Sequence, residues 1–455
     1  MSQMIKPQLP KGMRDFLPAD VLRRQYVIDT ISAVFQRYGY EPLQTPVMEL
    51  NSTLMGKYGE DAEKLIFHAK HPQGDEDLAL RYDLTVPLVR AYAQNEAKIA
   101  LPFKRYQIAP VWRAERPQRG RFREFYQCDA DTVGITSMDA DAEAVSVAVT
   151  ALRALGFTDF AVKINNRKLL KGIGEYAGLT GDALANLYRS IDKLDKIGVD
   201  GVREEMAKGG IDAAVIDKIM ELITSARKEN NLSYVAAHAS IGTLREILDS
   251  NDDAMQGLSE LEQLVRYLQA LNVPEQNIDL DFSMVRGLSY YTGPIFEAVL
   301  LSDDPEERVG SIAGGGRYDD LIGLFRKESL ATVGISLGIE RLITIMDKRN
   351  MYPASLNRTV VQALVTVFSP EIRAESMKLA SELRAAGINV ELFMQDNKKL
   401  GQQFGYADKK GIPVVAVLGP DEVANGQVKL KRLADQHEVT VAHAEAITTL
   451  RGLLA

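Results

Sequence analysis

The sequence has very little cysteine and no long apolar run, and each shortage excludes a class of protein. Its 455 residues include one cysteine, Cys128, which excludes both an intramolecular disulfide framework and a metal site with several thiolate ligands. A reducing intracellular compartment is the simplest setting for such a chain. No segment approaches the roughly 18 consecutive apolar residues of a membrane span, and the first residues lack the apolar core of a secretory signal. We expect a soluble, cytoplasmic protein.

Several common site motifs are absent as well. The sequence contains neither a Walker A motif nor the G-x-G-x-x-G fingerprint of dinucleotide-binding domains. Its five histidines show no metal-ligand spacing; only His68 and His71 are close together, in a polar loop typical of a surface. The 34 glycines and 17 prolines are about a tenth of the chain, which excludes collagen-like and low-complexity proteins. The net charge of −8 argues against a protein that coats polyanions nonspecifically.

The pattern of apolar residues changes along the chain. Helical and strand patterns alternate over residues 21–163, whereas residues 168–272 are almost wholly helical, for example over Ala183–Ile197. Strand patterning returns at Ile278–Met284 and Ile295–Leu301 and is followed by a glycine-rich turn. We therefore expect a helical insertion within a strand-rich domain.

A second, smaller domain is expected after a polar, proline-containing linker at residues 349–358. Beyond the linker, apolar strand patterns alternate with helical ones in the order Val360–Phe368, Pro370–Ala386, Ile388–Met394, Lys398–Lys410 and Ile412–Leu418. This βαβαβ order predicts a small α/β domain with a partly parallel sheet.

The densest charge cluster is a basic hairpin between two expected antiparallel strands, Leu101–Ile108 and Phe122–Val133. Residues 104–123 contain one acid, Glu115, and seven basic residues: Lys104, Arg105, Arg113, Arg116, Arg119, Arg121 and Arg123. A solvated surface is the usual interpretation of such a run. Arginine predominates here, however, and its planar guanidinium suits bidentate capture of phosphate or carboxylate. Pro117 and Gly120 predict a turn between the strands, so arginines flank the loop.

The strand after this loop has an unusual face. Phe125, Gln127, Asp129 and Asp131 alternate with other residues, so on a strand all four side chains point to the same side. One aromatic ring, one amide and two carboxylates are poor material for a hydrophobic core. We therefore expect this face to form the floor of a ligand site.

The remaining candidate segments lie after residue 284. Val285–Gly293 is a polar loop, and the three glycines of Gly314–Gly316 predict a turn that lets the backbone approach a ligand closely. Arg341 is expected on a helix that begins soon afterwards. The G-x-S-x-G pattern of Gly334–Gly338 is typical of a hydrolase nucleophile elbow, but the histidines that follow it belong to the separate C-terminal domain, which argues against a hydrolase.

Taken in order, these segments resemble the class II aminoacyl-tRNA synthetases, and specifically the histidyl-tRNA synthetase family. The matching motifs span nearly the whole chain: Pro10–Asp15, Gly39–Pro46, Arg81–Thr85, Trp112–Gln127, Arg286–Tyr291, Gly314–Asp320, the segment that ends at Arg341, and Leu400–Gly411. The resemblance implies an α+β catalytic domain on a mostly antiparallel sheet (1–167 and 273–348), a helical insertion (168–272), a linker (349–358) and a C-terminal α/β anticodon-binding domain (359–455). It also implies a homodimeric ligase that activates L-histidine with ATP, assisted by Mg²⁺, and transfers it to tRNA(His).

The resemblance assigns roles in ATP binding. Arg113 and Arg286 are the expected catalytic residues: Arg113 bridges the amino-acid carboxylate and the α-phosphate, and Arg286 lies on the other side of that phosphate. Two anions must meet in this reaction, so dense, fixed positive charge is what the chemistry requires. For the rest of the nucleotide, Arg121 and Arg341 are expected at the β- and γ-phosphates, Glu115 at the adenine amino group, and Phe125 stacked on the adenine ring.

A second set is expected to bind histidine: Asp83, Leu84, Thr85, Arg113, Gln127, Asp131, Arg286, Tyr290 and Tyr291. Within it, Asp83, Thr85 and Gln127 are acceptors for the ammonium group. Asp131 and Tyr291 are partners for the imidazole nitrogens, since an unpaired buried nitrogen is costly, and Tyr290 lines the pocket. The chain departs from many bacterial members, which carry glutamate at the positions of Asp83 and Asp131 and often aspartate at that of Ser289.

Two other functions share parts of this pattern. A regulatory paralogue from histidine biosynthesis resembles the catalytic domain but usually lacks the C-terminal domain and parts of the catalytic set. An RNA-binding module on a synthetase scaffold would tolerate loss of the ATP-binding arginines. Arg113, Arg286 and Arg341 are all present, and so is the C-terminal domain, which favours the ligase.

Overall fold

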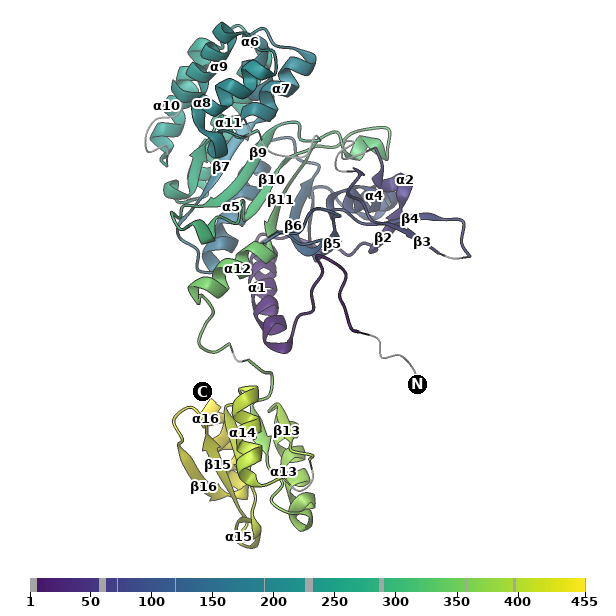
Figure 1. Ribbon diagram of the computed structural model, residues 1–455, viewed down its shortest axis with the longest axis vertical. Coiled ribbons are helices and arrows are strands. Elements are labelled where there is room, and N and C mark those ends of the chain that lie inside the picture. The colour runs from purple at the N-terminus through teal and green to yellow at the C-terminus, as the bar shows by residue number, and fades with distance from the viewer. Residues whose placement is uncertain are drawn as a thin grey trace. The chain divides into compact units, whose positions relative to one another are not determined.

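Two compact units make up the computed structural model, which describes residues 6–56, 63–71, 73–118, 120–191, 193–225, 232–285, 290–356, 358–395 and 398–454 (Figure 1). One unit comprises Met1–Arg14 and Tyr26–Met351, and the other comprises Asp15–Gln25 and Tyr352–Ala455. Helix α1 (Pro18–Arg37) contributes residues to both. None of the helices in the described residues is long and apolar enough to cross a membrane.

The larger unit is built on a mostly antiparallel sheet, which confirms the predicted fold class. Its strands lie in the order β1 (Glu41–Pro42), β5 (Phe103–Trp112), β6 (Glu124–Val133), β11 (Thr332–Gly338), β10 (Ala313–Arg317), β9 (Pro294–Leu300), β7 (Phe160–Asn166) and β8 (Ile278–Leu280). Parallel pairing is confined to the two edges, where β1 joins β5 and β8 joins β7. The predicted basic hairpin forms the β5–β6 pair, and β6 is central, between β5 and β11.

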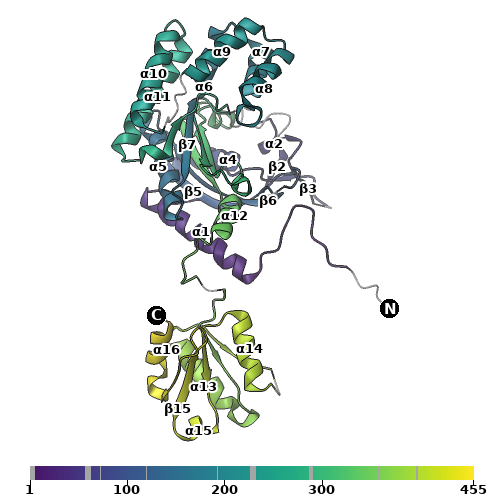
Figure 2. The same ribbon diagram turned by 60° about the vertical axis from the view of Figure 1, so that its left-hand side comes forward.

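Helices cover one face of this sheet (Figures 1 and 2). Helix α5 (Asp139–Ala154) packs against β10 and β11, and α11 (Asp252–Ala270) packs against α5, β7 and β9. Acidic residues occupy the first turn of α5 and Arg153 its last, which suits the helix dipole. Helix α12 (Ile339–Arg349) follows β11 directly and ends at Asn350, whose left-handed backbone closes the helix.

The three glycines of Gly314–Gly316 form part of strand β10, so the prediction of a turn there was wrong. The reason is the close approach of neighbouring strands. A Cβ atom at Gly315 would lie 2.0 Å from the Gly334 carbonyl oxygen of β11, a contact that no side chain permits. Glycine is therefore needed here for strand-to-strand packing rather than for chain reversal.

Replacing Gly315 by alanine should destabilise the larger unit by about 1–3 kcal/mol, because the new methyl group meets backbone that cannot move aside. Gly314→Ala is the matched control, since the nearest atom to its Cβ position is 3.6 Å away. The sole tryptophan, Trp112, lies in β5 of the same sheet, so its fluorescence during urea unfolding reports on this unit. Equal stability of the two variants would contradict the packing argument.

The expected helical region is present between β7 and β8. It contains α6 (Arg167–Tyr176), α7 (Gly181–Ile191), α8 (Leu194–Lys208), α9 (Ala213–Ser225), α10 (Tyr234–Ile247) and α11. The helix expected over Ala183–Ile197 is instead divided between α7 and α8, and Gly198 interrupts α8 again with non-helical dihedrals. The side chain of Asn251 accepts a hydrogen bond from Ala254 N and so caps α11.

The smaller unit contains the predicted α/β arrangement. Strands β13 (Val390–Leu392), β12 (Ala363–Val365) and β14 (Val414–Val417) are parallel neighbours, connected through α13 (Arg373–Ala385) and α14 (Leu400–Lys410). The sequence patterns did not predict the antiparallel β15 (Gln427–Arg432) and β16 (Glu438–Ala442), or the short helices α15 (Pro420–Ala424) and α16 (Ala446–Leu454).

A second small sheet, also not predicted, lies in the larger unit beside the site. It has the order β2 (Met48–Leu50), β4 (Asp77–Leu80) and β3 (His68–Lys70), with α2 (Asn51–Leu54) and α4 (Thr85–Asn95) next to it in sequence. Strand β4 runs into the segment Arg81–Thr85. Asp83, in the middle of that segment, is held in position because its Oδ1 accepts a hydrogen bond from Val86 N (3.0 Å) at the start of α4.

Candidate active site

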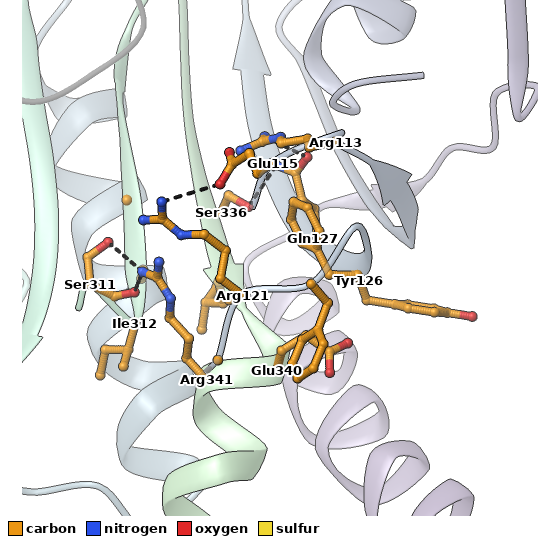
Figure 3. Close-up of a pocket in the computed structure, with 17 residues that line it drawn as sticks. Arg113, Glu115, Arg121, Tyr126, Gln127, Ser311, Ile312, Ser336, Glu340 and Arg341 are labelled. Carbon is orange, nitrogen blue, oxygen red and sulfur yellow. Dashed lines mark hydrogen bonds and ion pairs between the residues drawn. The ribbon is translucent and has the colours of Figure 1, made fainter. Parts of the chain in front are cut away.

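Two adjoining cavities lie over strands β6, β10 and β11 of the larger unit. The arginine cavity, about 260 Å³, is lined by Arg113, Glu115, Arg121, Phe125, the first turn of α12 and segment Ser311–Gly314, among others (Figure 3). The carboxylate cavity, about 170 Å³, is lined by Asp83, Thr85, Asp129, Asp131, Tyr290, Tyr291 and Tyr318, among others. Arg113, Gln127, Gly314 and Ser336 line both, so the two cavities share a wall.

Strand register explains why the floor is polar. Gln127, Asp129 and Asp131 are alternate residues of β6, and all three line the carboxylate cavity, as the sequence pattern predicted. On the flanking strands, Arg105 of β5 and Gly334 of β11 lie opposite Asp131, and Ser336 of β11 lies opposite Asp129. A Cβ atom at Gly334 would lie 1.9 Å from Asp131 Oδ1, so glycine at 334 leaves room for the carboxylate.

The arginine cavity contains fixed cations. Arg341, on the first turn of α12, is held by the carbonyl and hydroxyl oxygens of Ser311, and Arg121 Nη1 lies 3.3 Å from Glu115 Oε2. The N-terminal end of α12 also faces this cavity, and a helix N-terminus favours anions. The cavity therefore suits a polyanion such as a string of phosphates.

Arg113 stands where the two cavities meet. Its Nε donates to the Tyr82 carbonyl oxygen (3.1 Å), and its guanidinium lies 4.4 Å from the centroid of the Tyr82 ring and 5.1 Å from that of Phe125. Its Nη2 is 3.5 Å from Gln127 Oε1. These contacts hold the guanidinium in one place while it borders both cavities, so it can meet an anionic group from either side.

The N-terminal segment holds the hairpin loop beside the arginine cavity, a role that sequence reasoning did not assign. Gly12 accepts a hydrogen bond from Arg123 N (2.9 Å) and has φ +83°, and a Cβ there would lie 2.8 Å from Pro117. Arg14 forms an ion pair with Glu340 and lies 3.2 Å from the centroid of the Phe122 ring. The motif Pro10–Asp15 is thus structural support for the loop that carries Arg121.

In the carboxylate cavity, Asp131 has partners inside the protein. The Tyr318 hydroxyl donates to its Oδ1, and Arg105 Nη2 lies 2.8 Å from its Oδ2. Burial raises the pKa of Asp131, and the Arg105 charge opposes that rise. For Asp129, burial raises the pKa to about 7, and the neighbouring Asp131 charge adds to this effect. The floor therefore carries two carboxylates over one buried guanidinium.

The tyrosines form an aromatic wall. Ring centroids of Tyr290 and Tyr291 are 5.0 Å apart, and Tyr318 lies 5.6 Å from Tyr290 and 6.4 Å from Tyr291. Burial raises the pKa of Tyr290 and of Tyr291 well above the ordinary tyrosine value, so both hydroxyls keep their protons near neutral pH and remain able to donate.

Most of the predicted site residues are brought together at these cavities. Glu115, Arg121, Phe125 and Arg341 line the arginine cavity, Asp83, Thr85, Asp131, Tyr290 and Tyr291 line the carboxylate cavity, and Arg113 and Gln127 line both. Leu84 lines neither; its side chain is buried and its carbonyl oxygen accepts from Arg105 Nη2 (3.1 Å). Arg286 and Ser289 lie outside the described residues.

Three polar residues that line the carboxylate cavity, Asp129, Tyr318 and Ser336, were given no role in substrate binding by the resemblance, nor was Arg105, which pairs with Asp131. Asp129 shares the alternating face of β6 with Asp131, and that pattern was sufficient to find it. Ser336 is the serine of the G-x-S-x-G pattern that is typical of a hydrolase nucleophile elbow. The structure places it in the interior of β11, where its hydroxyl lies 3.3 Å from Gln127 Nε2, and not at a strand-to-helix turn.

Comparison with known proteins agrees with this arrangement. The family model for histidyl-tRNA synthetase matches residues 12–342, and a model for an anticodon binding domain matches residues 362–453. A histidine–tRNA ligase of Flavobacterium johnsoniae is 39% identical over 486 residues, covering 98% of this chain and 99% of its own length. One of Aeropyrum pernix is 41% identical over 451 residues, covering 99% of each chain. The crystal structure of histidyl-tRNA synthetase from Nostoc superposes with a TM-score of 0.85 at 32% identity, over 99% of this chain and 100% of that one. The chain belongs to the histidyl-tRNA synthetase family.

Proposed function

We propose that this chain is a histidine–tRNA ligase, which activates L-histidine with ATP and transfers it to the 3′ end of tRNA(His). The observation that carries the proposal is the pair of cavities that share a wall at Arg113 and Gln127. One cavity offers arginines to a polyphosphate, and the other offers buried carboxylates and tyrosines to a small polar molecule. The shared wall is where a carboxylate from one cavity can meet a phosphate in the other.

In the activation step, a histidine carboxylate oxygen forms a bond to the α-phosphorus of ATP while the bond to the bridging oxygen breaks, and pyrophosphate leaves with the electron pair. Arg113 holds the carboxylate and α-phosphate together and offsets their repulsion. Arg121 and Arg341 hold the β- and γ-phosphates, Glu115 accepts from the adenine amino group, and Phe125 stacks on the adenine. Arg286, assigned by family resemblance, stabilises the charge on the α-phosphate from the other side.

Histidine recognition uses the carboxylate cavity. Asp83, Thr85 and Gln127 receive the ammonium group near the shared wall, and the imidazole ring extends toward Asp131 and Tyr291. Leu84 lies between Asp83 and Thr85, and its carbonyl oxygen accepts a hydrogen bond from Arg105. A pocket of this kind rejects apolar amino acids, because they leave its buried polar groups unpaired.

In the transfer step, a hydroxyl of the terminal ribose attacks the adenylate carbonyl carbon, AMP leaves, and the hydroxyl proton passes to an oxygen of the adenylate phosphate. We assign the catalytic domain to residues 1–167 and 273–348, the insertion at 168–272 to the acceptor arm, and residues 359–455, after a linker at 349–358, to the anticodon. The match of an anticodon binding domain model to residues 362–453 supports the last assignment.

Family membership supports three further proposals: a homodimer, a cytoplasmic location and a requirement for Mg²⁺. The carboxylates that line the arginine cavity, Glu115 and Glu340, are each paired with an arginine. This arrangement suits a metal ion that arrives bound to the nucleotide. Phosphate oxygens and water would then supply most of the ligands, as Mg²⁺ prefers. When bound, the ion neutralises phosphate charge beside Arg121 and Arg341.

Histidine-dependent exchange of pyrophosphate into ATP tests the function. The purified chain should catalyse exchange with free histidine, without tRNA, and show no exchange above background with the other amino acids. The regulatory paralogue and the RNA-binding module both predict no exchange. Its absence from folded protein would overturn the proposed function.

A further inference from the structure

The charges in the carboxylate cavity are not all matched within the protein. The charge of Asp131 is paired: the Tyr318 hydroxyl donates to its Oδ1, and Arg105 Nη2 forms an ion pair with its Oδ2 (2.8 Å), although Oδ2 accepts no hydrogen bond from the described residues. Arg105 is completely buried and lies directly opposite Asp131 in the β5–β6 register, so the pair is internal to the sheet. The negative charge of Asp131 is therefore balanced within the protein, while its Oδ2 can still accept a hydrogen bond from a ligand.

Asp129 has only neutral hydrogen-bond partners, although the nearby Arg105 charge opposes the rise in its pKa. It is 3% exposed, the Ser336 hydroxyl bonds its carboxylate, and the Gln127 amide nitrogen is 3.4 Å from its Oδ1. Within the part of the chain that the structure describes, no ion pair joins this carboxylate to a lysine, arginine or histidine. A buried carboxylate that lines a cavity and forms no direct ion pair favours a ligand that brings positive charge.

Under the proposed function, histidine brings three ionisable groups to the site. Its carboxylate belongs at Arg113 and its ammonium at Asp83, near the shared wall. The imidazole ring then lies over the deeper floor, where Asp129 and Asp131 present carboxylate oxygens. A neutral imidazole has one N–H donor and one lone-pair acceptor, whereas the protonated ring has two donors. Two carboxylates match two donors.

We propose that Asp129 is a specificity-determining residue that holds the imidazole ring of histidine in its protonated form, with one ring N–H directed to Asp129 and the other to Asp131. This inference rests on the proposed function and deepens it. The groups that face Asp129 are Gln127 and Asp131 on its own strand, Arg105 and Gln107 on β5, Ser336 on β11, and Asp83, Arg113, Tyr290, Tyr291 and Tyr318 around the cavity. Of these, Arg105 and Arg113 are cationic: Arg105 forms its ion pair with Asp131, and under the proposed function Arg113 binds the carboxylate of histidine.

The binding of histidine in this form changes the number of bound protons, which can be measured. Burial and the Asp131 charge raise the pKa of Asp129 to about 7, and free imidazole has a pKa of about 6.5. At pH 8 both groups are therefore mostly unprotonated before binding, while the complex holds one proton between them. Histidine binding should take up close to one proton at pH 8, and its affinity should fall about tenfold per pH unit above that range.

Isothermal titration of histidine into the full-length protein at pH 8, in HEPES and in Tris, measures that proton from the difference in heats, because the two buffers differ in their heats of protonation. We expect uptake close to one proton for the natural protein and close to none for Asp129→Asn, which should also bind histidine roughly tenfold to a hundredfold more weakly. Glu124→Gln, on the same strand but exposed and outside the cavities, is the matched control and should keep the uptake.

The natural protein alone can decide the question if Asp129→Asn fails to fold. Binding without proton uptake would overturn the inference and leave the ligase function standing, and uptake that persists in Asp129→Asn would remove Asp129 from the role. ¹⁵N spectra of labelled histidine in the complex should show protons on both ring nitrogens, and one bare nitrogen would contradict the proposal. Absence of both histidine binding and exchange would instead overturn the proposed function.

Discussion

Replacing Arg113 by alanine lowers histidine-dependent pyrophosphate exchange by about two to three orders of magnitude, the loss typical of removing one fixed electrostatic donor from a transition state. The magnitude follows from its position. Arg113 lines both cavities, and its guanidinium is held by the Tyr82 carbonyl oxygen and by the rings of Tyr82 and Phe125. No flexible surface side chain could replace a charge placed so firmly where two anions meet.

Arg116→Ala is the matched control for that experiment. Arg116 belongs to the same hairpin and is exposed, and it lines neither cavity, so its loss should leave exchange without tRNA within about twofold. The effect of Arg113→Ala should appear mainly in kcat, because the charge it offsets develops as the carboxylate approaches the α-phosphate. A loss smaller than tenfold would contradict the bridging role.

Replacing Arg317 by methionine should lower the free energy of unfolding of the larger unit by about 3–5 kcal/mol, because it leaves a buried carboxylate without its cation. Arg317 on β10 pairs with Asp141 on α5, and both side chains are less than 5% exposed. The guanidinium also donates to the carbonyl oxygens of Ile135 (2.9 Å) and Ser137 (3.1 Å). One side chain thus joins the sheet to the helix that covers it.

A double-mutant cycle tests whether the pair itself is responsible. Asp141→Leu combined with Arg317→Met should recover much of the stability lost in Arg317→Met alone, since the combined change leaves no unpaired charge. Urea unfolding followed by Trp112 fluorescence reports on this unit. Arg203→Met, which breaks the exposed pair with Asp217, should change little. A single-mutant loss below about 1 kcal/mol would show that the pair is not needed.

Much of the site could be predicted, because a site for charged ligands needs polar and charged side chains at regular spacing, and that spacing is visible in the sequence. The alternation of Gln127, Asp129 and Asp131 placed three polar groups on one face of a strand, and β6 has that face toward the carboxylate cavity. The turn at Pro117 and Gly120 likewise placed arginines at the end of a hairpin. In both cases the information is local, within a few residues of one element.

What could not be predicted depends on register between distant segments. Nothing near Gly315 in the sequence indicates that the Gly334 carbonyl will lie against it, so three glycines suggested a turn instead of a strand. The pairing of Arg105 with Asp131 is set by the β5–β6 register, and the support that Arg14 gives through Glu340 joins residues 326 positions apart. The sequence pattern also did not predict the break between α7 and α8, because the helical spacing of apolar residues continues across it.

Under the proposed function, the shared wall also couples the binding of one substrate to the binding of the other. Arg113, Gln127, Gly314 and Ser336 border both cavities, so any shift that accommodates an occupant of one changes the surface met in the other. Such coupling is reciprocal: if bound ATP tightens histidine by some factor, bound histidine must tighten ATP by the same factor. A substitution at Ser336, which lines both cavities, should therefore change the effect of ATP on histidine affinity and the effect of histidine on ATP affinity by the same factor.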